Sequence, residues 1–379
     1  MARKVRIAVV AGDGIGPEVI GQALKALDAV SVALGLGLAH KEFLAGASLY
    51  RAKGKQWSAG AFERCREADA VLFGAVGLPG VLLPDGRPAG ADVLFGLRKG
   101  LDLYANIRPV RLLPGVAHVI SGERLLVWRP EEVDLVIVRE NTEGLYSADA
   151  QLRPKGDATV DLRRISRRGS ERIIRAAFEL AVRRSSARAK DASAKVTCVD
   201  KSNLLAGCVL FNRVFGDVAQ KYPSVRTDHL HIDAATLALL RSPESYDVLV
   251  TTNLFGDILS DMASMLGGGL GTAPSANIGA KHAMFEPVHG TAPDIAGKDV
   301  ANPVGAMLSA GMMLDWLGDR RRDWLFKLGA SLIERAVADA TAQGVRTRDI
   351  GGTARCSEVG DAVAARIGNL ALRMRGPQG

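Results

Sequence analysis

Two aspartates in the segment "VTTNLFGDILSDMASML" have the spacing of a metal site. Asp257 and Asp261 are four residues apart and follow an apolar strand that ends near Thr252, with Gly256 expected to make the turn into a helix. Residues four apart share one helix face, and open α/β folds bind ligands at the carboxyl ends of their strands. Two carboxylates so placed repel each other unless a cation joins them, and oxygen ligands suit Mg²⁺ or Mn²⁺. Alternatively, Asp257 complements the helix dipole and Asp261 is solvated.

Further charged residues stand at the boundaries of predicted elements. Asp233 in "HIDAATL" is a candidate third carboxylate, although alone it fits a helix N-cap equally well. Three arginines end or flank apolar segments, namely Arg98 in "GLRKGLDLY", Arg108 in "ANIRP" and Arg139 in "VDLVIVRE". A guanidinium binds a carboxylate in a bidentate manner. Taken singly, each arginine fits a structural ion pair; beside a divalent cation, the set suggests a small polycarboxylate ligand.

Two residues have the chemistry of proton transfer. Lys201 follows the apolar run "KVTCVD", and Tyr146 follows "RENTEGL". A lysine held near other cations has a lowered pKa and can act as a general base, while a tyrosine can deliver a proton. The sequence alone does not show that the two residues meet.

These residues need a scaffold, and the hydrophobic pattern predicts one. Short apolar runs alternate with amphipathic helical segments, which favours an α/β fold with a largely parallel sheet. Strands are predicted over 5–11, 69–76, 133–140, 195–201 and 246–253, and helices over 17–34, 170–184, 257–266 and 303–317. Two stretches without such periodicity, 78–92 and 146–164, are expected to be functional loops or arms.

The composition excludes several classes of protein. A chain of 379 residues with 47% hydrophobic and 24% charged residues is long enough for about two globular domains. The four cysteines form no CxxC pair, and no apolar run has transmembrane length, so we expect a cytoplasmic protein without zinc, disulfides or membrane contact.

Basic residues outnumber acidic ones, 49 to 41, and six arginines crowd residues 163–175. A nucleic-acid-binding protein on a former enzyme scaffold is one interpretation of this cluster. A solvated helix face is favoured instead, because no aromatic residues interleave with the arginines.

The glycine-rich segment "VVAGDGIGPEVI" at residues 9–20 does not fit a dinucleotide-binding fingerprint. Counting from Gly12, the sixth position is Pro17 rather than glycine, and Val32 stands where an acidic residue should hold a ribose. The segment instead predicts a strand, a glycine turn and a helix with Pro17 in its first turn.

Six segments together resemble the isocitrate/isopropylmalate dehydrogenase family of metal-dependent oxidative decarboxylases. They are "GDGIGPEV", "LRKGLDLYANIRP", "VIVRENTEGLY", "VDKSN", "TTNLFGDILSDMAS" and "FEPVHGTAPDIAGKDVANP". The resemblance extends from about residue 5 to about residue 365. It implies a two-domain α/β fold that is not a Rossmann fold, with the active site in a cleft between the domains. Residues 1–103 and 268–379 would form the larger domain, 104–267 the smaller, dimer-forming domain, and 146–164 an arm that clasps the partner.

The resemblance also implies roles for individual residues. Asp257 and Asp261 would bind the metal, and Asp233 would be donated to the metal and the substrate by the neighbouring subunit of a homodimer. Lys201, again from the partner, would take part in deprotonating the C2 hydroxyl, and Tyr146 would protonate the carbon left after CO₂ departs. Arg98, Arg108 and Arg139 would hold the carboxylates of a hydroxy-dicarboxylate or tricarboxylate.

The implied cofactor site is the loop 289–302. Its expected contacts are His289, Gly290, Thr291, Ala292, Asp294, Ile295 and Asn302. Asp294 can accept both ribose hydroxyls of NAD and would repel a 2′-phosphate, so NAD is the expected cofactor.

The substrate is indicated less directly. Leu94 and Phe95 offer an apolar surface, as in isopropylmalate dehydrogenases, where isocitrate enzymes carry a serine. By contrast, Asn141 and Glu143 in "RENTEGLY" resemble the isocitrate, homoisocitrate and tartrate branches, and "VRLLPGV" and "SRRGSERIIRAAFELA" resemble tartrate and D-malate dehydrogenases. We therefore expect an uncharged C3 substituent, with isopropylmalate first, D-malate or tartrate next, and isocitrate or homoisocitrate as the remaining alternative.

Overall fold

The computed structural model describes residues 4–120, 123–125, 127–146, 157–158, 160–187 and 194–374. The chain divides into two compact units. The first comprises Met1–Leu101, Leu113–Val127 and Gly267–Gly379, and the second comprises Asp102–Leu112 and Trp128–Leu266. Leu113–Val127 thus belongs to the first unit, although the sequence suggested 104–267 as one continuous domain. The reason is local packing, because Gly115 lies against Thr341 and Val116 lies against Gly268.

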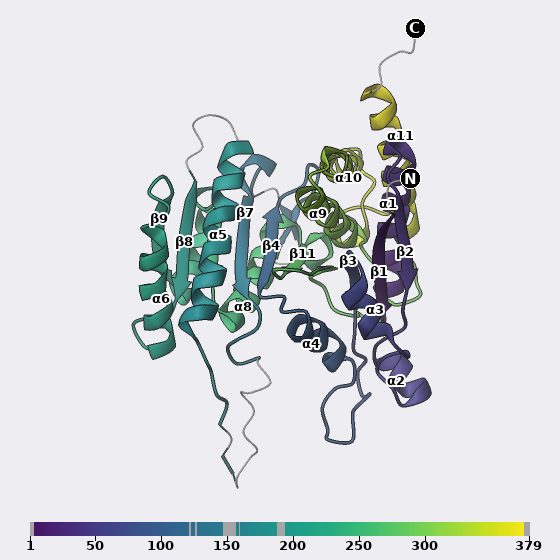
Figure 1. The fold of residues 1–379 in the computed structure, drawn as a ribbon. Helices are drawn as coiled ribbons and strands as arrows, with labels where there is room; N and C mark the ends of the chain where they lie inside the picture. Colours follow the sequence, from purple (N-terminus) through teal and green to yellow (C-terminus); the bar gives the residue numbers. More distant parts are fainter. Residues whose placement is uncertain are drawn as a thin grey trace. The chain divides into compact units, whose positions relative to one another are not determined.

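The first unit contains a mixed sheet with the strand order β2-β1-β3-β12-β11. β1 lies between β2 and β3 (Figure 1). Its strands are β1 (Val5–Gly12), β2 (Leu38–Glu42), β3 (Ala70–Ala75), β11 (Pro274–Ile278) and β12 (Ala283–Pro287), and a separate hairpin is formed by β5 (His118–Ile120) and β6 (Glu123–Leu125). Neighbouring strands run parallel except β11 and β12, which are antiparallel. β1 and β3 are almost continuous apolar runs, as expected for strands covered on both faces.

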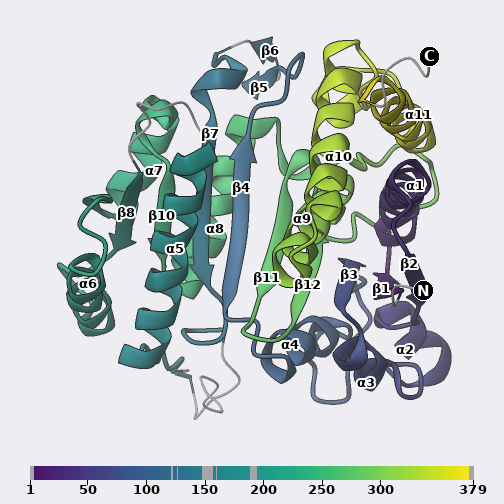
Figure 2. The same cartoon turned by 45° about the horizontal axis from the view of Figure 1, so that its top comes forward.

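The helices of the first unit are α1 (Gly16–Leu34), α2 (Ala47–Lys53), α3 (Ala61–Glu67), α4 (Ala91–Gly100), α9 (Val304–Arg321), α10 (Trp324–Ala342) and α11 (Cys356–Met374). Of these, α1, α3 and α9 pack on the strands of the sheet, while α10 packs on α9 and α11 packs on α1. α9 lies along β11 and β12, with α10 beside it (Figure 2). α1 has a proline in its first turn, as predicted, and it ends at Gly35, whose φ of 70° lies in the left-handed region that favours glycine.

The second unit has the strand order β4-β7-β10-β8-β9. Its elements are β4 (Ala105–Arg111), β7 (Asp134–Glu140), α5 (Arg167–Ala187), β8 (Lys195–Asp200), α6 (Ala206–Ala219), β9 (Arg226–His231), α7 (Ile232–Arg241), β10 (Val248–Thr251) and α8 (Asn253–Ser264). β4 is antiparallel to β7, and the other neighbours are parallel. α5 packs on one face of these strands and α8 on the other (Figure 2).

The parallel register of the second unit brings candidate residues to one sheet edge. Thr251 pairs with Arg139 of β7 on one side and with Val199 of β8 on the other. The strands therefore end at the same level, and Lys201 and Asn253 follow directly.

The predicted strands and helices are confirmed, with ends shifted by a few residues. The prediction for Gly256 is wrong, because α8 already begins at Asn253 and Gly256 lies in its first turn instead of making the turn. All four cysteines are buried and free, which confirms that they form no disulfide framework. Within the described residues, no helix combines the length and apolar character needed to span a membrane.

Candidate active site

Arg139 lies at the centre of a charged cluster at the edge of the second unit's sheet. Its side chain is only 2% exposed. Its Nη1 donates to Asp257 Oδ1 through a short contact, while its Nε and Nη2 donate to Asn253 Oδ1 at 3.1 and 2.7 Å. A buried guanidinium without partners would destabilise the folded state. These contacts therefore stabilise the fold, and the same side chains can also bind a ligand.

Arg108 on β4 approaches the same helix. Its Nη1 donates to Asp261 Oδ1 at 2.9 Å and to Ser260 Oγ at 2.7 Å, and its Nη2 donates to Asp257 Oδ1 at 3.3 Å. Its Nε donates to Asn106 Oδ1 at 2.7 Å. Two guanidiniums and two carboxylates therefore form one cluster, contributed by β4, β7 and α8.

The two aspartates keep their carboxylates accessible. Their side chains are 30% exposed for Asp257 and 51% exposed for Asp261, whereas both arginines are buried. Burial raises the pKa of Asp261; the Arg108 guanidinium opposes this shift and the Asp257 carboxylate adds to it. The donor set of two oxygen ligands, four residues apart on one helix, fits a hard divalent cation such as Mg²⁺.

The sequence did not indicate three polar residues of this cluster. Asn253 is buried, accepts from Arg139 and donates its Nδ2 to the Glu143 carbonyl at 2.8 Å. Ser260 and Asn106 accept from Arg108. The position of Asn253 at the end of the run "VLVTTN" was the one available signal, because a polar side chain directly after a buried strand often has a specific partner.

Gly256 explains how Arg139 fits against α8. A Cβ at this position would lie 2.6 Å from both Cβ and Cγ of Arg139, which is closer than real contacts allow. The glycine is therefore a packing requirement of the buried arginine.

Tyr146 lies beside the cluster. Its ring centroid is 5.7 Å from Arg139 Cζ, and its side chain is partly exposed. Burial raises the pKa of Tyr146, and the Asp257 carboxylate raises it further. The phenol therefore stays protonated at neutral pH, the state required of a proton donor. Of the suggested arm 146–164, residues 147–156 and 159 lie outside the described residues.

Lys201 and Asp233 form a second group. Lys201 Nζ donates to Asp233 Oδ1 at 2.7 Å, and this hydrogen bond lowers the pKa of Asp233. The Asp233 side chain is 69% exposed, in the first turn of α7. The lysine and the carboxylate are thus presented together at the surface of the second unit.

The remaining candidate arginine belongs to the first unit. Arg98 on α4 is buried and donates its Nη2 to Glu286 Oε1 at 2.8 Å. Glu286 also accepts from Asn277 Nδ2, at 2.8 Å. Among the described residues, Arg98 Nε has no hydrogen-bond partner. On the same helix, Phe95 is exposed and Leu94 is half-buried, so both can present apolar surface.

The predicted cofactor loop packs against the glycine-rich segment that opens the chain. Ile15 N donates to the Thr291 carbonyl at 2.8 Å, and a Cβ on Gly14 would lie 2.0 Å from that oxygen. Glu18 accepts from the backbone N–H groups of Gly297 and Asp299. The opening motif therefore supports a loop nearly three hundred residues further along the chain.

Individual residues of this loop differ in environment. Asp294 is exposed and its carbonyl accepts from Lys298 Nζ at 2.7 Å. Ala292 has φ 37°. Burial lowers the pKa of His289, so its imidazole is neutral at pH 7. Asn302 donates to Asp349 Oδ2 at 2.8 Å and accepts from Val304 N, which fixes the end of the loop. Gly290 and Ile295 lie in the same loop.

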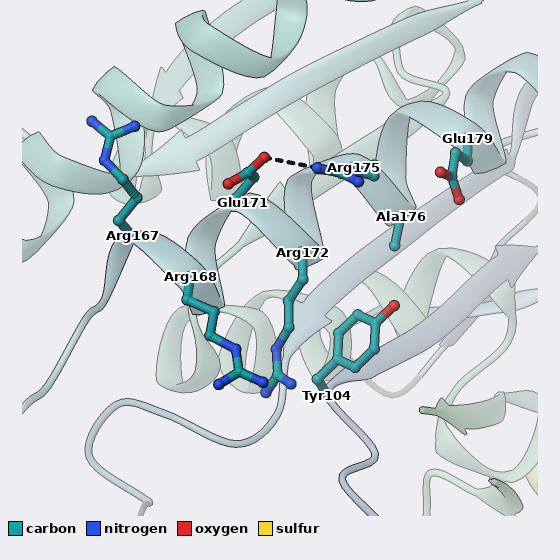
Figure 3. A pocket seen from close by; sticks show the side chains of 8 residues that line it. All are labelled: Tyr104, Arg167, Arg168, Glu171, Arg172, Arg175, Ala176 and Glu179. Carbon is teal, nitrogen blue, oxygen red and sulfur yellow. Dashed lines mark hydrogen bonds and ion pairs between the residues drawn. The ribbon is translucent and has the colours of Figure 1, made fainter. Parts of the chain in front are cut away.

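The arginine cluster of the sequence lies mainly on α5, in a groove of about 610 Å³ (Figure 3). Arg167 pairs with Asp217 at 2.7 Å, Arg172 with Asp102 at 2.8 Å, and Arg175 with Glu171 at 2.7 Å. The Arg172 guanidinium also stacks on Tyr104 at 4.5 Å. These three arginines thus each have a carboxylate partner nearby, which supports the interpretation of a solvated helix face.

The fold and the site define the class of the protein, which is an enzyme of the oxidatively decarboxylating dehydrogenases. Within this class, the chain belongs to the isocitrate/isopropylmalate dehydrogenase family, whose model matches residues 6–363.

Similar proteins agree with this assignment. The chain is 41% identical over 363 residues to a 3-isopropylmalate/3-methylmalate dehydrogenase of Methanocaldococcus jannaschii, with 96% of this chain and 98% of the relative covered. It is 42% identical over 379 residues to a 3-isopropylmalate dehydrogenase of Leifsonia xyli, with 96% and 99% covered. The crystal structure of isocitrate dehydrogenase from Methylococcus capsulatus has a TM-score of 0.81 at 34% identity, covering 96% of this chain and 99% of that one.

Proposed function

We propose that the chain catalyses the NAD-dependent oxidative decarboxylation of a 3-substituted malate, with 3-isopropylmalate as the substrate. The observation that carries the reaction type is the cluster of two buried arginines facing two helical carboxylates. The names of the relatives support the choice of isopropylmalate, and the apolar Leu94 and Phe95 suit an uncharged substituent.

We assign Asp257 and Asp261 to a divalent Mg²⁺ or Mn²⁺ ion, with Asp233 contributed by the partner subunit of a homodimer. When bound, such an ion stabilises the negative charge that develops on the oxygens of the substrate during oxidation and decarboxylation.

Side chains of the protein bind the substrate and transfer its protons. Arg108 and Arg139 hold the substrate's carboxylates, because their guanidiniums are fixed by Asn106 and Asn253 before the substrate arrives. Lys201 removes the proton of the C2 hydroxyl in the partner's site. Tyr146 returns a proton to carbon after CO₂ leaves, and its raised pKa keeps that proton available.

A substrate panel tests this proposal. With Mg²⁺ and NAD present, isopropylmalate is expected to give the highest kcat/KM among isopropylmalate, D-malate, tartrate, isocitrate and homoisocitrate, measured by NADH absorbance. An apolar substituent that contacts Leu94 and Phe95 gains from burial, whereas an extra carboxylate there would stay unpaired. Highest efficiency with isocitrate or homoisocitrate would contradict the assignment of these two residues, and highest efficiency with D-malate or tartrate would establish the alternative branch.

The cofactor assignment has its own test. Asp294 is exposed and carries a negative charge where a 2′-phosphate would approach, so NAD should be preferred over NADP by at least about tenfold in kcat/KM. Asp294→Lys is expected to weaken NAD binding and reduce that preference. Asp315→Lys is the matched control, because Asp315 is a surface carboxylate of the same unit that pairs with Lys327. An NADP preference in the wild type would overturn the assignment.

A further inference from the structure

A cluster of metal-ligating side chains lies at the edge of the second unit, apart from the carboxylates of α8. Asp200 ends β8, and His229 and His231 lie on the edge strand β9. The strands are parallel, with Cys198 paired to His229 and Asp200 paired to His231. Residues two apart on a strand share one face, so both imidazoles and the carboxylate lie on the same side of the sheet.

The donor atoms of these three residues are close together. One ligand atom from each lies within 4.8 Å of the others, and His229 Nε2 is 3.0 Å from Asp200 Oδ1. The two imidazole rings meet edge to face, with their centroids 5.1 Å apart. Metal–ligand bonds of about 2 Å place donors that share one ion about 3 to 4 Å apart. The donors of this cluster, at separations of up to 4.8 Å, are close to that spacing.

Hydrogen bonds from neighbouring residues fix the orientation of the Asp200 carboxylate. It is fully buried, and it accepts from Ser202 N at 2.8 Å, Asn212 Nδ2 at 3.0 Å and Cys198 Sγ at 3.8 Å. Burial alone would raise the pKa of Asp200, but the hydrogen bonds from His229, Ser202 and Asn212 prevail and lower it. Such outer hydrogen bonds orient the ligating carboxylate in metal sites.

His231 supplies a donor that the fold does not use. Its ring is half-buried, and among the described residues its nitrogens have no hydrogen-bond partner. By contrast, the cluster of Glu18, Asp299 and Cys356 is already occupied by protein contacts. Its carboxylates accept backbone N–H groups, and burial raises the pKa of Cys356 to about 12, so the thiol stays protonated.

We propose that Asp200, His229 and His231 bind a first-row transition-metal ion of the Zn²⁺ type. The expectation of a protein without zinc rested on the spacing of the cysteines, and this site contains no cysteine. Two imidazoles and one carboxylate favour such an ion over Mg²⁺, which prefers oxygen ligands alone. Three protein ligands leave further positions open to water. Asp200 Oδ1 also accepts a hydrogen bond from Ser202 N, in the turn that presents Lys201. An ion bound to this oxygen would compete with that hydrogen bond and so change the position of Lys201. This second step rests on the proposed function.

The test uses Co²⁺ as a spectroscopic probe in the presence of excess Mg²⁺. Wild-type protein is expected to bind one Co²⁺ per chain at this site, and His231→Gln should weaken that binding by at least about tenfold, because losing a ligand should cost at least as much as losing an outer partner. The matched control is His40→Gln. His40 is a histidine paired with one carboxylate, Asp28, at 3.2 Å, and it should leave Co²⁺ binding unchanged.

A gain of signal provides the second measurement. His231→Cys is expected to add a thiolate-to-Co²⁺ charge-transfer band that the wild type lacks. Equal Co²⁺ affinity in the wild type and His231→Gln, or no new band in His231→Cys, would overturn the site. Because these readouts measure Co²⁺ binding and the absorption of bound Co²⁺, they do not depend on turnover. In the NADH assay, Zn²⁺ should lower kcat of the wild type and leave kcat of His231→Gln unchanged. Equal inhibition of both proteins would contradict the second step, in which the ion acts on the turn that presents Lys201.

Discussion

Replacing Lys201 with alanine is expected to lower kcat by about 10² to 10⁴-fold, the usual contribution of a positioned acid or base. Lys201 Nζ contacts Asp233 Oδ1 at 2.7 Å, so the substitution removes both the proposed base and a partner of the proposed third metal ligand. Lys195→Ala is the matched control, because Lys195 begins β8, the strand that Lys201 follows, and pairs with Asp228 at 3.0 Å. It should retain most of the activity. Unchanged turnover in Lys201→Ala would refute the catalytic assignment.

Mixing inactive chains tests whether Lys201 serves the partner's site. Lys201→Ala alone and Asp261→Asn alone should each be nearly inactive. In a dimer with shared sites, one mixed dimer contains one site with both residues intact. Random exchange of subunits should therefore restore about a quarter of wild-type activity. A mixture no more active than its components would show that Lys201 acts within its own chain.

Gly256→Ala is expected to destabilise the protein by about 1–3 kcal/mol, because the new methyl group overlaps a buried side chain that is already fully bonded. Its Cβ would meet Arg139 Cβ and Cγ at 2.6 Å, so the stem of the arginine, and not its flexible end, must move. Arg139 would then lose its alignment with Asn253 and Asp257, and kcat/KM should fall as well. A thermal unfolding scan measures the first effect, at about 1–2 °C for each kcal/mol in a chain of 379 residues.

Gly216→Ala is the matched control for this substitution. Gly216 lies in α6 of the same unit, and a Cβ there would meet nothing within 4 Å. Alanine should therefore stabilise the helix, by about 0.5–1 kcal/mol. A Gly256→Ala variant as stable as Gly216→Ala would show that Arg139 has room to move.

Local pattern predicted much of the fold. The runs at β1, β3 and β7 are apolar enough that burial on both faces follows from composition, and α1 shows both its proline start and its apolar periodicity. The start of α8 could not be predicted in the same way. Glycine usually indicates a turn, but at Gly256 the close approach of Arg139 determined the residue, and that contact joins positions 117 apart in the sequence, since 256 minus 139 is 117.

The candidate site was also predicted only in part, because local spacing was informative and distant contacts were not. The spacing of Asp257 and Asp261 indicated a shared helix face, and the structure places both against arginines. The partners could not be assigned, because Arg98 meets Glu286 at a separation of 188 residues and Arg108 meets Asp261 at 153. Asn253 was missed because one amide at a strand end carries too little information.

The division of the chain into units has a consequence for folding during synthesis. The second unit consists of Asp102–Leu112 and Trp128–Leu266, so nearly all of it can assemble once residue 266 has left the ribosome. The first unit needs Gly267–Gly379, which includes β12, the strand that pairs with β3. At about 5–20 residues per second, β3 waits on the order of ten seconds or more for that strand. During this interval the edge of β3 that later pairs with β12 is open, and an unpaired apolar edge can pair with another chain.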